Sequence, residues 1–158
     1  MQNKLKLNLA NIPKWIPIVL LIIAIIGFAD ATYISIESFN NKIPPCTTDG
    51  CETVLTSEYA KILGVPVSYY GAIYYFIIMI MIFSYLDTKK EIFLRIPIIL
   101  SVLGLLFSIW FMTVMIFIIK AICPYCILSA ISSITIFIIS LFTYINYREK
   151  IQNYEKTI

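Results

Sequence analysis

The sequence predicts an all-α integral membrane protein, a four-transmembrane-helix bundle whose outer loop contains a short amphipathic helix. Three observations predict this fold class. The 158 residues are 60% hydrophobic and only 13% charged, whereas a soluble domain is about 25% charged. The mean hydropathy is +0.89. The charged residues also gather between four long apolar runs, so a bilayer is the solvent that fits this chain.

Each of the four apolar runs is long enough to form a transmembrane helix. A helix needs about 20 apolar residues to cross the hydrocarbon core, and backbone groups in lipid must be satisfied within the helix. We expect one membrane domain over 1–158, with a polar tail that frays. Its expected parts are helices over about 15–38, 67–86, 95–119 and 124–146, an outer loop over 39–66 and a cytoplasmic tail over 147–158.

The first run also has features of a cleavable signal peptide. Lys14 precedes the apolar stretch, and Ala29–Ala31 fits a small-x-small cleavage pattern. However, the run is longer than a usual signal core and continues past Tyr33, which favours a retained helix. Asp30 is an acid well inside this run, and such a carboxyl is a candidate for proton handling or for a structural hydrogen bond.

The second half of the outer loop is expected to form the amphipathic helix, over residues 51–63. Its apolar residues fall at helical spacing, which is typical of a helix on a membrane surface; they are Val54, Leu55, Tyr59, Ile62 and Leu63. Gly64 then fits a helix C-terminus and is soon followed by Pro66.

The distribution of Lys and Arg predicts the orientation. Nine of them fall on the side of the two termini, namely Lys4, Lys6, Lys14, Lys89, Lys90, Arg95, Arg148, Lys150 and Lys156. Three fall on the other side, namely Lys42, Lys61 and Lys120. The positive-inside rule therefore predicts cytoplasmic termini and an outer face that carries the 39–66 loop. Because this rule explains the basic residues, the net charge of +3 does not indicate nucleic-acid binding.

The chain has no histidine and four cysteines, all on the predicted outer side: Cys46, Cys51, Cys123 and Cys126. Disulfides persist on that side of a membrane. Cys123 and Cys126 form a C-x-x-C at the start of the fourth helix, where the helix terminus favours a reactive thiolate. The residues alone leave three interpretations open: a thiol–disulfide relay, structural disulfides, and a Cys₄ zinc site.

Three segments together resemble the vitamin K epoxide reductase family: Cys51–Ser57, Gly64–Gly71 and Cys123–Cys126. Gly27–Tyr33 is similar to the prokaryotic branch of that family, and the resemblance covers about residues 15–146. It implies a helix bundle around a quinone pocket. It also implies an enzyme that oxidises a thioredoxin-like partner and reduces a quinone such as menaquinone or ubiquinone.

The resemblance also implies a role for each cysteine. Cys46 would exchange with the partner, and Cys51 would attack Cys123. Cys126 would lie against the quinone as a thiolate. The partner is expected to be a separate thioredoxin-like protein on the outer side of the plasma membrane, since no such domain follows in the chain. No metal is expected to take part.

Four further residues match positions near the family's pocket: Ser57, Val67, Tyr70 and Ala130. Ser57 is expected to support the pocket by hydrogen bonding, and Tyr70 to stack on the quinone or to belong to an interfacial aromatic belt. Vertebrate members have Asn and Tyr where this chain has Val67 and Ala130. This difference favours plain quinone reduction. Vitamin K quinone or epoxide reduction and a non-catalytic protein with structural disulfides or zinc stay as alternatives.

Overall fold

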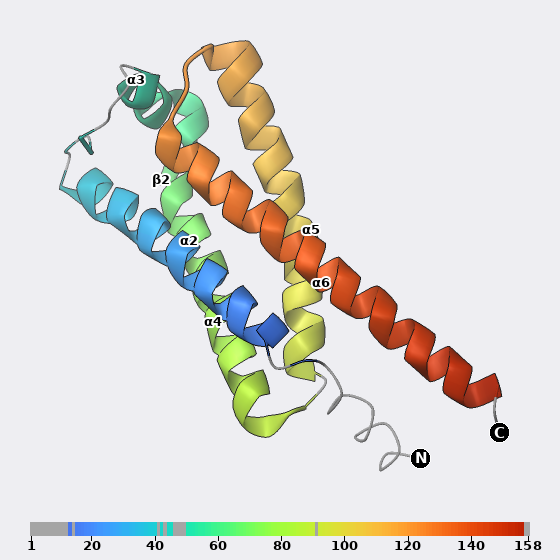
Figure 1. Ribbon diagram of the computed structural model, residues 1–158. Coiled ribbons are helices and arrows are strands. Elements are labelled where there is room, and N and C mark those ends of the chain that lie inside the picture. The colour runs from blue at the N-terminus through green and yellow to red at the C-terminus, as the bar shows by residue number, and fades with distance from the viewer. Residues whose placement is uncertain are drawn as a thin grey trace.

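Four long helices form the body of the protein, and a small cap covers one end of it (Figure 1). The computed structural model describes residues 13, 15–40, 42, 44–45, 50–90 and 92–156, with side chains up to residue 146. The long helices are α2 (Trp15–Phe39), α4 (Val67–Thr88), α5 (Ile92–Thr113) and α6 (Pro124–Lys156). The cap consists of α3 (Gly50–Thr56), the 3₁₀ turn η1 (Glu58–Ala60) and the strands β1 (Lys61–Ile62) and β2 (Val65–Pro66).

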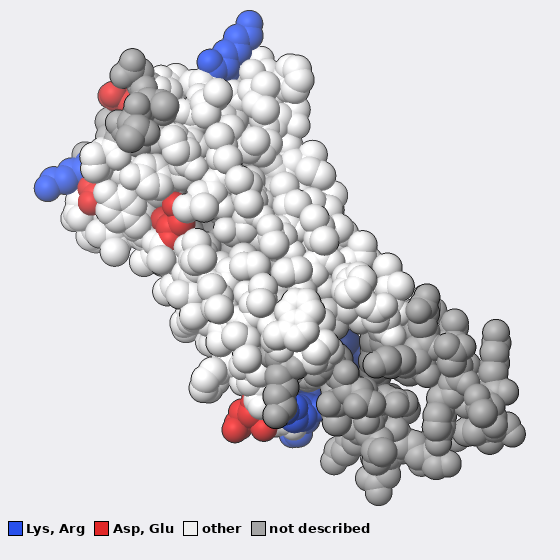
Figure 2. All heavy atoms as spheres, in the orientation of Figure 1, with Lys and Arg blue, Asp and Glu red and all other residues white. Residues whose placement is uncertain are grey.

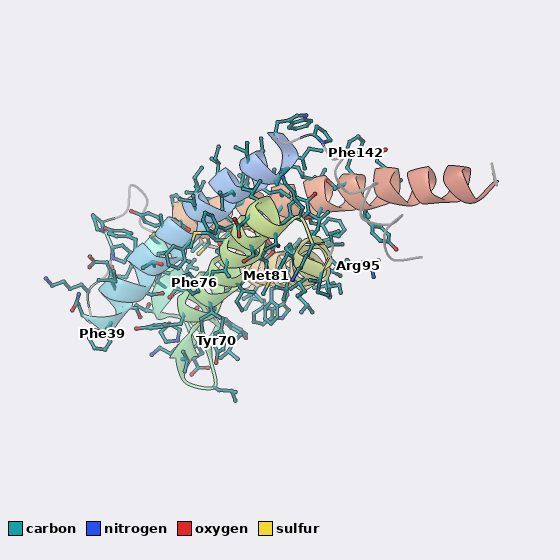
Figure 3. The ribbon with its side chains drawn as sticks, turned by 90° about the horizontal axis from the view of Figure 1, so that it is seen from below. Phe39, Tyr70, Phe76, Met81, Arg95 and Phe142 are labelled. Carbon is teal, nitrogen blue, oxygen red and sulfur yellow. The ribbon has the colours of Figure 1, made fainter. Side chains whose placement is uncertain are left out.

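Among the described residues, four helical segments are long and apolar enough to cross a membrane: Trp15–Phe39, Val67–Thr88, Ile92–Ile119 and Pro124–Asn146. The predicted fold class, an all-α bundle of four transmembrane helices, is thus confirmed. Figure 2 shows Lys, Arg, Asp and Glu mostly at the two ends of the molecule, with an almost uncharged surface between them. Large apolar side chains cover that surface. Phe76 is 45% exposed and Phe142 is 59% exposed, and both lie on the outside of the bundle (Figure 3).

The centre of the bundle is held by a close contact between a glycine and a tyrosine. A Cβ atom on Gly27 of α2 would lie 2.5 Å from the ring of Tyr75 on α4. The Tyr75 side chain is 1% exposed, and its hydroxyl donates a hydrogen bond of 2.7 Å to the carbonyl oxygen of Ser129 on α6. The Tyr75 ring is held between its backbone on α4 and its hydrogen bond to α6, so it cannot move away from α2. The absence of a side chain at position 27 therefore allows α2, α4 and α6 to pack together.

The cap differs from the helix that the sequence predicted over 51–63. Helix α3 ends at Thr56, and Ser57 has an extended backbone. The hydroxyl groups of Thr56 and Ser57 donate hydrogen bonds to the carbonyl oxygens of Glu52 and Val54, which is how such residues compete with helix continuation.

The expected helix C-terminus at Gly64 is instead the turn of a hairpin. Strands β1 and β2 pair antiparallel, with Ile62 opposite Val65. The two residues between them, Leu63 and Gly64, have φ angles of 53° and 80°. Positive φ at both central residues is the geometry of a tight two-residue hairpin turn, so the amphipathic spacing of the apolar residues predicted the wrong element here.

Two further helix boundaries differ from the sequence prediction. The third membrane helix was expected to be continuous over 95–119, but α5 gives way to a π-helical turn, η2 (Val114–Ile119), which ends at Lys120 with a φ of 55°. The tail over 148–158 was expected to fray, but α6 continues to Lys156. The apolar run marks only the part of a helix that lies in lipid, and nothing in residues 147–156 breaks a helix, since Pro and Gly are absent from it.

Candidate active site

The sulfur atoms of Cys51 and Cys123 lie 3.5 Å apart, although 72 residues separate them in the chain. Cys51 comes from α3 in the cap, and Cys123 comes directly before α6. Both side chains are 0% exposed and pack with Val54 and Met115, the latter from the π-helical turn. The π-helical turn η2 thus packs against the cap beside the two sulfur atoms. Such turns are frequent at functional sites.

Gly50 sets how closely the cap approaches this point. A Cβ atom at position 50 would lie 2.7 Å from the backbone nitrogen of Ile122 and 2.8 Å from its carbonyl oxygen. Those atoms belong to the main chain beside Cys123, so they cannot swing aside as a side chain can. The absence of a side chain at Gly50 is therefore what lets α3 carry Cys51 to Cys123.

Tyr125, inside the C-x-x-C, connects Pro45 to the start of α6. Its hydroxyl donates a hydrogen bond of 3.1 Å to the carbonyl oxygen of Pro45. Its ring packs on Tyr33 of α2, with ring centroids 5.8 Å apart. Pro45 directly precedes Cys46, which itself lies outside the described residues. The tyrosine thus holds Pro45 next to the C-x-x-C.

The two cysteines of the C-x-x-C have different chemical surroundings. A hydrogen bond from the Cys126 thiol is the largest influence on Cys123, and it lowers the pKa of Cys123 from 9.0 to about 7. Burial opposes this effect, while the backbone N–H groups of Cys126 and Tyr125, in the first turn of α6, add to the lowering of the pKa. The helix terminus therefore favours a thiolate as the sequence predicted, but on Cys123. In this structure Cys126 donates the hydrogen bond, and its role as the thiolate in quinone reduction stays a prediction.

Cys51 is disulfide-bonded, whereas Cys123 and Cys126 are free thiols. Cys123 is buried and Cys126 is half-buried. In the described part of the chain, no group of three or more His, Cys, Asp or Glu residues is placed to hold a metal ion.

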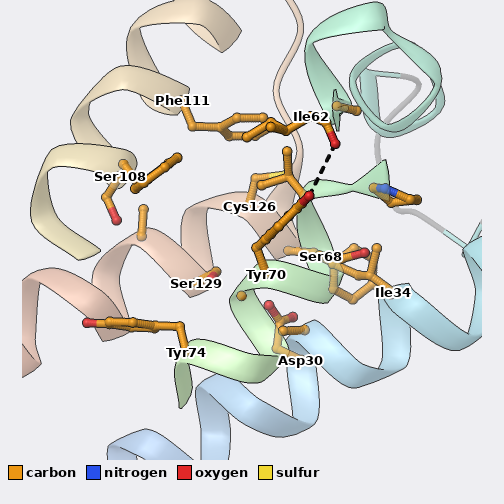
Figure 4. A pocket seen from close by; sticks show the side chains of 18 of the residues that line it. Asp30, Ile34, Ile62, Ser68, Tyr70, Tyr74, Ser108, Phe111, Cys126 and Ser129 are labelled. Carbon is orange, nitrogen blue, oxygen red and sulfur yellow. Dashed lines mark hydrogen bonds between the residues drawn. The ribbon is translucent and has the colours of Figure 1, made fainter. Parts of the chain in front are cut away.

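A cavity of about 740 Å³ lies beside the C-x-x-C, between the helices and under the cap (Figure 4). Cys126 lies on its wall, together with apolar and aromatic side chains such as Ile34, Tyr74 and Phe111. Cys123 is not among the lining residues. Within the described structure, Cys123 contacts Cys51 of the cap and Cys126 lines the cavity.

Three of the four predicted pocket residues line this cavity, namely Val67, Tyr70 and Ala130. The Tyr70 hydroxyl donates a hydrogen bond of 3.3 Å to the carbonyl oxygen of Ile62, which fixes the hairpin over the cavity (Figure 4). Ser57 is not among the lining residues. Its hydroxyl is bonded at 2.7 Å to the carbonyl oxygen of Val54, so it stabilises the end of α3 instead.

Two cavity-lining residues, Asp30 and Ser68, each have a buried polar atom without a partner in the described part of the chain, and the sequence did not indicate that they lie at the same cavity. Asp30 Oδ2 and Ser68 Oγ are buried without a hydrogen-bond partner among the described residues. Buried polar atoms are almost always hydrogen-bonded in proteins. A molecule in the cavity with hydrogen-bonding groups of its own can supply partners for this part of the wall.

Comparison with known families decides which chemistry this arrangement serves. The family model described as the vitamin K epoxide reductase family matches residues 18–141, a range that reaches into all four membrane helices and includes all four cysteines. The chain belongs to the vitamin K epoxide reductase family. No curated protein sequence gives a significant match.

Membership in the vitamin K epoxide reductase family makes the chain an oxidoreductase and a multi-pass membrane protein. The family links disulfide chemistry to a quinone in the membrane, and its members are generally linked to thioredoxin-like partners. The cavity fits a quinone. Its volume lies within the roughly 300–1,000 Å³ usual for small-molecule sites, its wall is mainly apolar, and its unpartnered polar atoms can meet ring oxygens.

Proposed function

We propose that the protein oxidises a thioredoxin-like partner and passes the electrons through two cysteine pairs to a quinone, so that it supports disulfide bond formation. In this proposal Cys46 and Cys51 are the shuttle pair, and Cys123 and Cys126 are the pair on the quinone side. The observation that carries the proposal is the 3.5 Å contact between the Cys51 and Cys123 sulfurs. Thiol–disulfide exchange needs a thiolate that directly approaches a disulfide sulfur.

The first transfer moves two electrons from the partner to the shuttle pair. A partner thiolate attacks Cys46 of the Cys46–Cys51 disulfide, and Cys51 leaves. The second partner thiol then attacks the mixed disulfide and displaces Cys46, so the partner gains a disulfide and Cys46 and Cys51 are reduced. Tyr125 supports this step, because its hydrogen bond to Pro45 holds the segment before Cys46 near the C-x-x-C.

The second transfer moves the electrons across the cap contact. The Cys51 thiolate attacks Cys123 in the Cys123–Cys126 disulfide, and Cys126 leaves and takes up a proton. Cys46 then attacks Cys51, the shuttle disulfide forms again, and Cys123 leaves as a thiolate. A low pKa makes Cys123 a good leaving group.

The last transfer takes place at the cavity. A bound quinone supplies an acceptor for two electrons and two protons. Cys126 lies on the cavity wall and Cys123 directly behind it, so the pair can close its disulfide while the apolar wall excludes water. Val67 and Ala130 present no hydrogen-bonding side chain to the cavity, which supports reduction of a quinone such as menaquinone or ubiquinone over reduction of a vitamin K epoxide.

The proposal includes an orientation in the plasma membrane. The cap and all four cysteines would face outward, where the partner acts, and the termini would face the cytoplasm. The bias of nine Lys and Arg residues against three supports this orientation.

Quinol formation by purified protein in lipid nanodiscs tests the proposal. Under anaerobic conditions, we expect the wild type to reduce short-chain ubiquinone or menaquinone when supplied with a reduced thioredoxin-like protein or with dithiothreitol. We expect Cys126→Ala to be inactive with both reductants. Cys46→Ala should lose only the protein-driven reaction, since a small dithiol can reach Cys126 through the cavity. Quinol formation by Cys126→Ala at the wild-type rate would exclude the mechanism.

A further inference from the structure

Asp30 places a carboxyl group on the wall of the same cavity that Cys126 lines (Figure 4). It comes from the middle of α2, where the bundle would cross the membrane, and it is 8% exposed. Among the described residues it is the only acidic residue that lines the cavity. Figure 4 shows its carboxyl oxygens directed into the space that Tyr70 and Ser129 also border.

One oxygen of the Asp30 carboxyl has no hydrogen-bond partner in the described part of the protein. Its Oδ2 atom is buried without a hydrogen bond among the described residues. An unpartnered carboxylate in a low-dielectric site costs far more than a neutral acid, so the protonated carboxyl is the form that suits this position. A protonated carboxyl is a hydrogen-bond donor, and a molecule in the cavity that Asp30 lines can supply its acceptor.

Asp30 is also close enough to act electrostatically on the C-x-x-C. A negative charge on Asp30 raises the pKa of Cys123, against the hydrogen bond from Cys126 that lowers it. A neutral Asp30 therefore preserves the Cys123 thiolate. When Cys123 is the thiolate, the reduced pair carries one proton, on Cys126, whereas reduction of a quinone consumes two.

We propose that the Asp30 carboxyl hydrogen-bonds to a ring oxygen of the quinone and supplies the second proton of its reduction. The proposal rests on the proposed function, because it assigns a role within that reaction. The Cys123 thiolate and the Cys126 thiol form one S–S bond and give up two electrons and one proton. Asp30 gives up the proton on Oδ2, and the quinone takes both electrons and both protons to become the quinol. The Asp30 carboxylate then regains a proton from water.

The test compares Asp30→Asn, which keeps a hydrogen-bond donor but carries no transferable proton, with Asp30→Glu, which keeps the acid. Thr32→Val is the matched control, because Thr32 Oγ1 is also buried without a partner among the described residues, on the same helix, but does not line the cavity. The probe is short-chain ubiquinone, and its binding is measured by quenching of Trp110 fluorescence in a Trp15→Phe background, since Trp110 lines the cavity.

We expect Asp30→Asn to bind ubiquinone within about threefold of the wild-type affinity and to lower kcat at least tenfold. Asp30→Glu should recover most of kcat, and Thr32→Val should match the wild type. The solvent deuterium isotope effect on kcat should be larger in Asp30→Asn, because proton delivery becomes limiting. A wild-type kcat in Asp30→Asn would overturn the proposal. So would a loss that appears only in binding.

Two further measurements separate failure of this proposal from other failures. If the wild type forms no quinol, the proposed function fails, whereas an active wild type with an equally active Asp30→Asn removes only the role of Asp30. If Asp30→Asn does not fold, infrared spectroscopy of the wild type with isotope-labelled aspartate decides. We expect a protonated carboxyl band that shifts when ubiquinone binds; a band that does not respond to ubiquinone would overturn the proposal.

Discussion

Cys123 and Cys126 lie on one turn of chain, yet they face different parts of the protein. Cys123 touches Cys51 in the cap and is fully buried, whereas Cys126 lies on the cavity wall. The hydrogen bond between them makes Cys126 the donor and gives Cys123 the lower pKa. The two cysteines therefore have separate roles in the proposed relay, since Cys123 exchanges with the cap and leaves readily, while Cys126 meets the acceptor.

The pKa of Cys123 provides a direct prediction. In a Cys46→Ala/Cys51→Ala background, which leaves only the C-x-x-C, we expect the Cys123 thiolate to form with a midpoint near pH 7. Adding Cys126→Ala removes the largest cause of the lowering, so the midpoint should rise toward the ordinary value of 9.0. Cys126→Ser keeps a hydrogen-bond donor and should raise it less. Ultraviolet thiolate absorbance against pH measures the midpoints, and equal midpoints in all three proteins would contradict the assignment.

For single residues, the sequence could predict which side chains are reactive, but it could not predict which side chains line the cavity. A C-x-x-C before a helix indicates a reactive pair because its backbone environment is local. Ser57 and Ser68 illustrate the opposite case. Both are serines near the start or end of an element, but only Ser68 lines the cavity, since that depends on how the cap folds over α4.

At the scale of elements, a close contact between the backbones of α3 and the segment before α6 places the Cys51 sulfur next to Cys123. Helix α3 meets the segment before α6 at Gly50, and the hairpin is fixed by the hydrogen bond from Tyr70 to Ile62. The sequence indicated a structured cap but not its form. The apolar residues over 51–63 fit a helix, whereas the turn at Leu63 and Gly64 depends on a left-handed backbone at Leu63 that leucine rarely adopts.

Gly50→Ala should weaken the relay without altering any cysteine. The added Cβ would lie too close to backbone atoms of Ile122, so α3 must move away and the Cys51–Cys123 contact must lengthen. In a Cys46→Ser/Cys126→Ser background, we expect the Cys51–Cys123 disulfide to form at least tenfold more slowly, as followed by non-reducing gel and mass spectrometry.

Gly71→Ala is the matched control for this experiment. Its added Cβ would lie 3.6 Å from the Cβ of Ala31, an ordinary contact, so the disulfide should form at the rate of the background protein. An unchanged rate in Gly50→Ala would show that the cap does not depend on this close approach.

At the scale of the whole molecule, the bilayer explains why the fold class was predictable. Four apolar segments in lipid have few alternatives to helices, because each must satisfy its own backbone groups. Packing adds the detail that composition cannot supply, such as the contact of Gly27 with Tyr75. The same bilayer separates the two charged ends, with Lys89, Lys90 and Arg95 around the α4–α5 connection and the cap at the opposite end.

The orientation of these two ends is the remaining prediction, and the proposed function depends on it. Leu63 at the tip of the hairpin is 95% exposed, whereas Lys90 is exposed at the opposite end. In a Cys46→Ala/Cys126→Ala background, the L63C variant should react with a membrane-impermeant maleimide in intact cells, because the positive-inside rule places the cap outside. The K90C variant should react only after the membrane is opened. Cys51 and Cys123 are 0% exposed and should contribute little signal. Labelling of K90C, and not L63C, in intact cells would place the cysteines on the cytoplasmic side, where disulfides are not maintained, and would remove the basis for a partner outside the cell.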